Sequence, residues 1–500
     1  MFPPGCQVPP ASQALPAVGQ GGRLAAIDRL RGALVVLVVL HHAVLAYCTF
    51  GHVDRADYAL STAPIVDAQR WRAFDALVLL DDGFFMPLLF LLSGLFVRGG
   101  LGRKGPGAYL RGRMRRLVLP FAVAVLTLIP FAYYPSSLQA GGRAGFPAFW
   151  IRTVTVGPWP SGPPWFLGVL LAFDVAATLV FVLIARGAPG GVDPCRFPGL
   201  DRIDRKKGEA RILSSPRGRG GAAPLAGGGG SPRIDPGRDR REGKGVFPEE
   251  PPSAPAPHPR SGCASACFAP GKGSKALSPP AGRGENPRLF LPRTVLSAPA
   301  RGFFLLVALS GLLYLPLLLA VGPGHWVGLG PFAIQASRVG LYAGYFATGV
   351  ALGWGGRPSV LHFGQALVVR WRLWALLALP AGLMLLAAGA IGAAGRLPAG
   401  PALVLEGIAR TVFCAAAAFA LPALFLRFGG RPSRAWDSLS ANSFAIYLLH
   451  YPVVTWLQFG LLARPLGAPL KGALVSALAV AASWAGAAAL RRVPLIRKGL

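Results

Sequence analysis

Long apolar runs separated by short polar stretches dominate the chain. About ten of these runs approach the length of roughly 20 residues that a helix needs to cross a bilayer. They fall at 32–50, 76–97, 117–134, 165–185, 302–321, 332–354, 371–394, 402–426, 439–461 and 469–490. Prolines inside several runs predict kinks, which membrane bundles tolerate; these are Pro87, Pro316, Pro380 and Pro422. The pattern predicts an all-α, polytopic membrane protein with about ten transmembrane helices.

Positive charge in the short loops predicts the orientation of these helices. Lys and Arg gather in the cytoplasmic loops of membrane proteins. The loop between the second and third runs is rich in both, with Arg98, Arg103, Lys104, Arg111, Arg113, Arg115 and Arg116. Placing this loop in the cytoplasm puts the other Arg-rich loops there as well, whereas the opposite loop at 322–331 has no Lys or Arg. We therefore expect both termini to be cytoplasmic.

Composition agrees with a membrane protein. Hydrophobic residues make up 53% of the chain and charged residues 14%, well below the roughly 25% charged residues of soluble domains. The formal net charge of +31 lies largely in one low-complexity stretch and in short loops, where it sets topology, so we expect no nucleic-acid partner. The six cysteines are scattered, which predicts neither a disulfide framework nor a zinc site.

The chain divides into five predicted segments. Residues 1–22 form a disordered tail without the features of a cleavable signal peptide, and residues 23–185 form the first part of the transmembrane domain, with four helices. Residues 186–293 are basic and rich in Pro and Gly, so they predict a disordered cytoplasmic insertion. It is either a tether attracted to anionic lipid or an insertion that function ignores, since long loops cost little. Residues 294–492 contain the remaining six helices, and 493–500 form a cytoplasmic tail.

An arginine and a histidine of the first apolar run are the clearest candidates for chemistry. Arg31 lies at the edge of the run and His42 inside it. They are eleven positions apart, so they share a helix face at a separation of about 16 Å. His41 is one position off and is expected to point elsewhere. An ionisable residue inside a bilayer is costly and is functional by default, although His42 can also be a neutral residue that hydrogen-bonds to a neighbouring helix.

The other ionisable or polar side chains within the apolar runs have structural alternatives. They are Asp81, Asp82, Asp174, Arg338, Glu406, Arg410, Tyr447 and His450. Asp174 and Arg338 can neutralise each other or a neighbour. Glu406 and Arg410 are four residues apart on one helix, which predicts an intrahelical ion pair.

Two pairs of polar residues are candidates for the surroundings of His42. Asp81 and Asp82 lie at a similar depth in the second run, and antiparallel packing would bring one carboxylate near the imidazole, where it would orient the tautomer. We take Asp82 as the catalytic candidate, with an interfacial cap as the alternative. Tyr447 and His450 share a helix face and form either a packed, hydrogen-bonded pair or a substrate contact.

The chain contains no nucleophile elbow, P-loop, zinc-protease motif or dithiol motif. A histidine base without a protein nucleophile suits direct transfer of an activated acyl group to a hydroxyl. Arg31 at the cytoplasmic edge can hold a phosphate, and the separation of about 16 Å from His42 is comparable to a pantetheine arm. This hypothesis makes acyl-CoA a co-substrate and predicts no bound cofactor or metal.

These residues resemble the membrane acyltransferase-3 family. Arg31 and His42 match its first-helix signature of Arg, ten residues and His, and Asp28 begins a stretch similar to its Asp-x-Leu-Arg opening. Four further segments are similar to family motifs in the same order: 84–94 with Ser93, 113–120 with its arginines, 162–167 with Trp165, and 443–450 with Tyr447 and His450. The resemblance spans residues 23–492 except for the insertion.

The opening motif, the paired histidines and the Met-Pro of the second run look most like the glucan-modifying branch of the family (glucans biosynthesis protein C-like). The resemblance implies an O-acyltransferase of the cell membrane that moves acetyl or succinyl from cytoplasmic acyl-CoA to a hydroxyl of a carbohydrate or cell-envelope acceptor. It implies that His42 is the base and Arg31 its companion. The candidate substrate-binding residues are Asp28, Ser93, Trp165, Tyr447 and His450. The expected partners are the donor, the acceptor and membrane lipids.

A transporter or flippase for a polysaccharide or lipid-linked substrate is the main alternative. Interrupted helices with a few buried charges also describe transporters. The halves of the chain show no clear duplication, and the Arg31–His42 pair has a natural catalytic use, so we favour the enzyme. An inactive paralogue that serves as a membrane partner is a third possibility, which the presence of both residues disfavours.

Overall fold

A computed structural model describes residues 20–58, 61–157, 159–160, 162–187 and 299–493. The predicted insertion, except for its first residues, lies outside the described residues, as do most of the N-terminal tail and nearly all of the C-terminal tail. The described part is mostly helical, as the apolar runs predict.

The helices before the insertion cover most of the first four predicted runs, and α7 is an additional helix between the third and fourth runs. They are α1 (Gln20–Leu45), α2 (Arg72–Asp82), α3 (Phe85–Gly94), α4 (Val97–Lys104), α5 (Pro106–Val123), the π-helical turn η2 (Ala124–Leu128), α6 (Ile129–Gln139), α7 (Phe146–Thr155) and α8 (Trp165–Gly187). The second run is two helices rather than one kinked helix, because α2 ends at Asp82 and α3 begins at Phe85. Pro87 lies in the first turn of α3, where its missing N–H costs nothing.

The elements after the insertion include the only strands of the described residues. They are α11 (Pro299–Val321), β1 (Trp326–Leu329), β2 (Phe332–Gln335), the 3-10 turn η3 (Ala336–Arg338), α12 (Val339–Trp354), α13 (Gly356–Val369), α14 (Trp371–Ala393), α15 (Ala399–Phe428), α16 (Arg434–Leu461) and α17 (Ala468–Leu490). The prediction that the run 332–354 is helical throughout is wrong at its start. There Phe332 pairs with Leu329 in an antiparallel hairpin, and Gly330 takes the positive φ of 58° that this tight turn requires.

Eight helical stretches of the described residues are long and apolar enough to cross a membrane: Arg72–Lys104, Pro106–Gln139, Trp165–Arg186, Pro299–Val321, Trp371–Ala393, Ala399–Phe428, Arg434–Leu461 and Ala468–Leu490. The other two predicted runs correspond to α1, which contains charged residues in its first half, and to α12, which has 16 residues. The protein is therefore a multi-pass membrane protein. The total of ten crossings and the cytoplasmic termini stay predictions.

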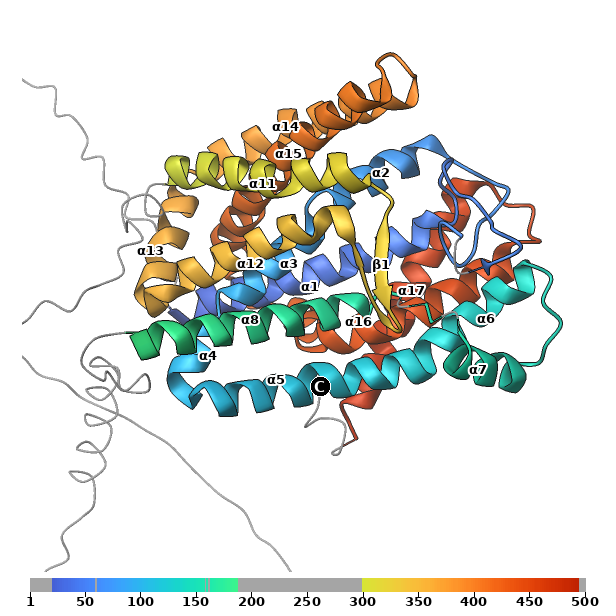
Figure 1. The fold of residues 1–500 in the computed structure, drawn as a ribbon, viewed down its shortest axis with the longest axis horizontal. Helices are drawn as coiled ribbons and strands as arrows, with labels where there is room; N and C mark the ends of the chain where they lie inside the picture. Colours follow the sequence, from blue (N-terminus) through green and yellow to red (C-terminus); the bar gives the residue numbers. More distant parts are fainter. Residues whose placement is uncertain (1–19, 59–60, 158, 161, 188–298, 494–500) are drawn as a thin grey trace, which may run out of the picture. The chain divides into compact units, whose positions relative to one another are not determined.

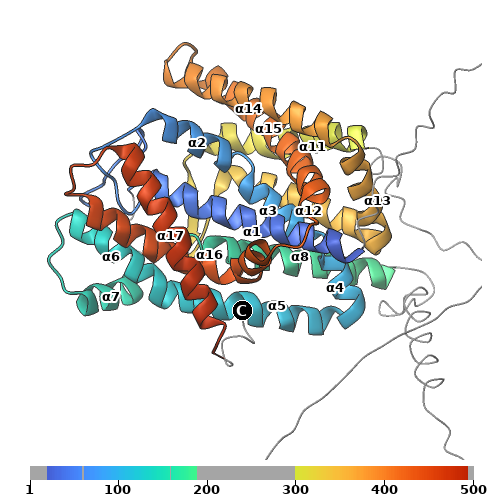
Figure 2. The same cartoon turned by 180° about the vertical axis from the view of Figure 1, so that it is seen from behind.

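Helix α1 is the central element around which the site is built. It packs against α15, α16 and α17 and against α2 and α3, and both ribbon views show it between α14 on one side and α5 on the other (Figures 1 and 2). Arg29, which is 4% exposed, joins the first half of α1 to α16 through an ion pair of 2.6 Å with Asp437. Arg31 contacts α3 and His41 contacts α2, so α1 runs antiparallel to the α2–α3 segment.

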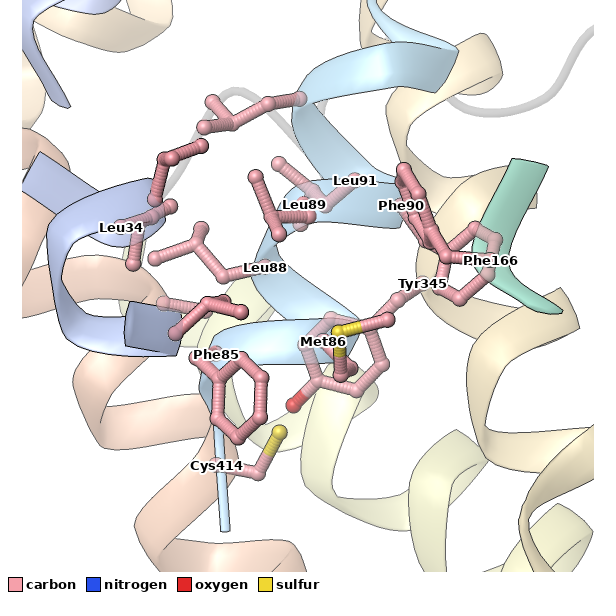
Figure 3. Packing of buried hydrophobic residues seen from close by; sticks show 14 of the residues in the cluster. Leu34, Phe85, Met86, Leu88, Leu89, Phe90, Leu91, Phe166, Tyr345 and Cys414 are labelled. Carbon is pink, nitrogen blue, oxygen red and sulfur yellow. The ribbon is translucent and has the colours of Figure 1, made fainter. Parts of the chain in front are cut away.

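Helix α3 forms the core next to this central helix. Nine of its residues are buried. A helix that is apolar on every face is buried by other helices on every face. Figure 3 shows Leu34 of α1 and Phe166 of α8 on opposite sides of α3, with Cys414 of α15 below Phe85. Because α2 directly precedes α3, the packing of α3 against α1 also holds α2 beside α1.

Candidate active site

The last turns of α1 place two histidines side by side within the bundle. The Nδ1 of His42 donates a hydrogen bond of 2.8 Å to the carbonyl of Val38, one turn earlier. Since a carbonyl can only accept, Nδ1 holds the proton and Nε2 is the basic nitrogen of the neutral ring. No described residue hydrogen-bonds to that Nε2. His42 therefore has the protonation state of a general base.

Helix α16 supplies the wall of the site opposite His42. The rings of His450 and Tyr451 lie 5.2 and 5.1 Å from the His42 ring, measured between centroids. His450 is fully buried, and its Nδ1 donates to the carbonyl of Tyr447 at 2.7 Å. Its Nε2 has no hydrogen-bond partner among the described residues. The Tyr447 hydroxyl donates to the carbonyl of Pro163, so Tyr447 and His450 pair through the backbone rather than through their side chains.

Two site residues on α16 were missed at the sequence level. Tyr451 packs edge-on against His42, and the Gln458 side-chain amide donates to the carbonyls of His42 and Ala43 at 2.9 and 3.0 Å. These bonds satisfy carbonyls that the end of a helix leaves free. Gln458 lies eleven positions after Tyr447, close to three helical turns, so it shares the face of that tyrosine. This spacing was the signal available in the sequence.

The carboxylate partner of the histidine pair differs from the prediction. His41 does not point away from the site, because its Nδ1 donates to Asp81 Oδ1 at 2.7 Å. Asp81 is 2% exposed. Asp82 does not pair with His42, because its carboxylate accepts two hydrogen bonds of 2.6 and 2.5 Å from Arg338.

Asp82 belongs to a buried ion cluster that joins three elements. Besides Arg338 at the end of η3, it contacts Arg410 of α15 at 3.3 Å. The predicted pair of Glu406 and Arg410 is confirmed, at 2.8 Å. Asp174 and Arg338 do not pair with each other, so the alternative prediction, a neighbouring partner for each, is the one confirmed. Asp174 lies 3.1 Å from Arg113 and accepts from the Tyr109 hydroxyl, both on α5, and Arg338 binds Asp82.

Arg31 lies at the other end of the site, on the same continuous helix as His42. Its Nη2 donates to the carbonyl of Leu92 at 3.0 Å, and its Nη1 lies 3.5 Å from the Asp28 carboxylate. Its guanidinium also covers the ring of Phe96, 4.6 Å from the centroid. A third of the side chain stays exposed. Eleven residues of helix separate Arg31 from His42 by about 16 Å.

The remaining candidates, Ser93 and Trp165, do not contact His42. Ser93 of α3 donates to the Leu89 carbonyl in its own helix and is adjacent to the residue that binds Arg31. Trp165 stacks on Tyr342 of α12, with centroids 5.5 Å apart. The residue after it, Phe166, lies 6.1 Å from the Tyr447 ring. Trp165 is thus separated from His450 by aromatic side chains.

The first part of the chain is similar to a known protein family. Residues 24–192 match the family model described as acyltransferase domain, of the acyltransferase-3 family. This segment contains Arg31, His41, His42 and Asp81, whereas α16 with His450 lies beyond it. No curated protein and no solved structure matches the chain. The match supports the acyltransferase-3 family and makes the protein an acyltransferase that transfers groups other than aminoacyl groups.

Proposed function

We propose that the protein moves an acyl group, such as acetyl or succinyl, from cytoplasmic acyl-CoA to a hydroxyl of a carbohydrate or cell-envelope acceptor. The tautomer of His42 is the observation that supports this proposal. Its Nδ1 is held by the Val38 carbonyl, so Nε2 presents a lone pair in the interior of the bundle. A base in this state takes the proton of a hydroxyl as its oxygen attacks a thioester.

Arg31 supplies the contact for the donor. Its guanidinium has five N–H donors, of which one binds the Leu92 carbonyl, and the side chain is partly exposed. The remaining donors suit the phosphates of coenzyme A. With the phosphates at Arg31, the pantetheine arm runs along α1 for about 16 Å and brings the thioester to His42.

The reaction at His42 is a direct transfer. The acceptor oxygen forms a bond to the acyl carbon, the carbon–sulfur bond breaks, and the hydroxyl proton passes to His42 Nε2. The buried Nε2 of His450, which has no partner among the described residues, is placed to accept a hydrogen bond from the acceptor. The resemblance to the glucan-modifying branch favours a glucan acceptor and the inner or plasma membrane as the location.

Acyl transfer by purified protein in lipid tests this function. Labelled acetyl-CoA and succinyl-CoA are supplied with a mixture of polysaccharides, and wild type is compared with His42→Ala and with His52→Ala, an exposed histidine of the loop after α1. We expect acceptor-dependent transfer to fall at least about 100-fold in His42→Ala and to persist in His52→Ala. Equal transfer by all three proteins would refute the role of His42.

The donor contact is tested separately. Arg31→Met should raise the apparent KM for acyl-CoA and leave kcat close to that of wild type. Arg115→Met, which removes an exposed arginine of α5, is the matched control and should change neither constant. An unchanged KM in Arg31→Met would remove Arg31 from donor binding and leave the base assignment intact.

A further inference from the structure

His41 and Asp81 form a buried pair that the proposed function does not use. The imidazole Nδ1 lies 2.7 Å from Asp81 Oδ1, and the side chains are 12% and 2% exposed. The other carboxylate oxygen of Asp81 is buried without a hydrogen-bond partner among the described residues. Because Asp82 is bound by two arginines, Asp81 is the carboxylate of α2 that faces the histidines.

The two histidines of α1 have different partners and adjacent rings. His42 donates to a neutral carbonyl, whereas His41 donates to a carboxylate, which orients the ring and compensates the charge of an imidazolium. Their ring centroids are 5.2 Å apart, in an edge-to-face arrangement. Phe85 packs on the far side of His41, at 5.3 Å. Two neighbouring imidazoles, one with a carboxylate and one without, are suited to opposite roles in one proton-transfer step.

The proposed reaction needs a proton donor as well as a base. When the carbon–sulfur bond breaks, its electron pair stays on sulfur and forms a thiolate. An unpaired anion inside a membrane protein is costly, and the arginines of the described cluster nearest His41 are already bound to carboxylates. A proton delivered to sulfur as the bond breaks removes that cost.

We propose that His41, oriented by Asp81, is the general acid that protonates the departing sulfur of coenzyme A. This inference rests on the proposed function. The acceptor oxygen bonds to the acyl carbon, its proton goes to His42 Nε2, and the sulfur takes a proton from His41 Nε2. Transfer of one proton from His42 to His41 then restores both residues, so the cycle consumes no proton. Asp81 acts through His41 and is a positioning residue.

A donor with a more acidic leaving group distinguishes a general acid from a residue that only stabilises the fold. A selenium analogue of acetyl-CoA keeps the whole nucleotide and pantetheine handle but releases a selenol, which is more acidic than a thiol and leaves without help from an acid. We compare wild type, His41→Gln and Asp81→Asn, whose amide oxygen still accepts from Nδ1. The two donors are measured on the same preparation, so their rate ratio is independent of the fraction of folded protein.

With acetyl-CoA, we expect kcat to fall about 100-fold or more in both variants, with little change in the apparent KM. With the selenium analogue, we expect a loss of less than about tenfold. An equal loss with both donors, or no loss with acetyl-CoA, would overturn the role of His41. The proposed function fails in a different way, through absence of transfer by the wild type or retention of transfer by His42→Ala.

Discussion

Helices α3 and α12 pack with their backbones in contact, and Gly349→Ala should force them apart. A Cβ atom at Gly349 would lie 2.2 Å from the carbonyl oxygen of Leu91, and one at Gly353 would lie 2.4 Å from that of Leu95. Two glycines four residues apart form the small-residue pattern that lets membrane helices approach closely. The substitution adds one methyl group to this contact.

The size of the effect follows from the geometry. Real Cβ atoms essentially never approach another atom closer than 3.0 Å, so the helices must separate by about 0.8 Å (3.0 minus 2.2). Overpacking of this kind costs about 1–3 kcal/mol, and the better helix propensity of Ala returns at most about 1 kcal/mol. We expect a net loss of about 1–2 kcal/mol. Because α3 follows α2, the shift should also disturb the contact between Asp81 and His41 and lower acyl transfer.

Thermal unfolding of the purified protein in detergent measures this loss. Gly311→Ala in α11 is the matched control, because the nearest atom to its added Cβ is Leu315 Cδ1 of the same helix, at 3.9 Å. The control should unfold at the wild-type temperature or slightly above it, and Gly349→Ala clearly below. Equal unfolding temperatures for the two variants would refute the close packing of α3 and α12.

Three further predictions concern charged groups. Asp82→Ala leaves Arg338 without its carboxylate, so we expect a loss of about 3–5 kcal/mol; an unchanged unfolding temperature would contradict the ion cluster. Lys471 and Asp67 form a buried pair at 2.7 Å, so Lys471→Met should speed hydrogen exchange at the Asp67 amide while leaving exchange in α3 unchanged. The backbone N–H groups of Ala56 and Asp57 lower the pKa of the partly exposed Asp54; its turn should be stable at neutral pH and loosen as the pH falls through that lowered pKa. In Asp54→Asn this acid-dependent step in hydrogen exchange should disappear.

The positions of most helices could be predicted from the sequence because hydrophobic length is a local property. The run 439–461 lies within α16 (Arg434–Leu461), and 371–394 coincides with α14 to within a residue. The run 332–354 failed at its start because continuous apolarity does not distinguish a strand from a helix. Its strand depends on pairing with Trp326–Leu329 across the turn at Gly330, and that pairing is a tertiary feature.

The sequence predicts how far apart site residues lie along one helix, but not which way each helix is rotated about its axis. The spacing of Arg31 and His42 gave their separation because one helix contains both. The carboxylate partner depended on the rotation of α2 about its axis, and Asp81 and Asp82 differ by about 100° in that rotation. A prediction based on depth alone therefore placed Asp82 near His42, whereas the contact that forms is between Asp81 and His41.

The interior of the bundle contains two kinds of polar group: those whose partners are other residues of the fold, and those without such a partner among the described residues. The carboxylate of Asp82 is neutralised by arginines of other elements, as expected for charges that must not remain alone in a membrane. His450 is different, because its Nε2 is fully buried and has no partner within the described part of the chain. Such an atom costs about 1–3 kcal/mol, which no contact of the fold offsets. A second hydroxyl of the acceptor that donates to this nitrogen would offset it, and the reacting hydroxyl would then lie beside His42, whose ring is 5.2 Å away. The unsatisfied nitrogen and the free base therefore favour two neighbouring hydroxyls of one acceptor.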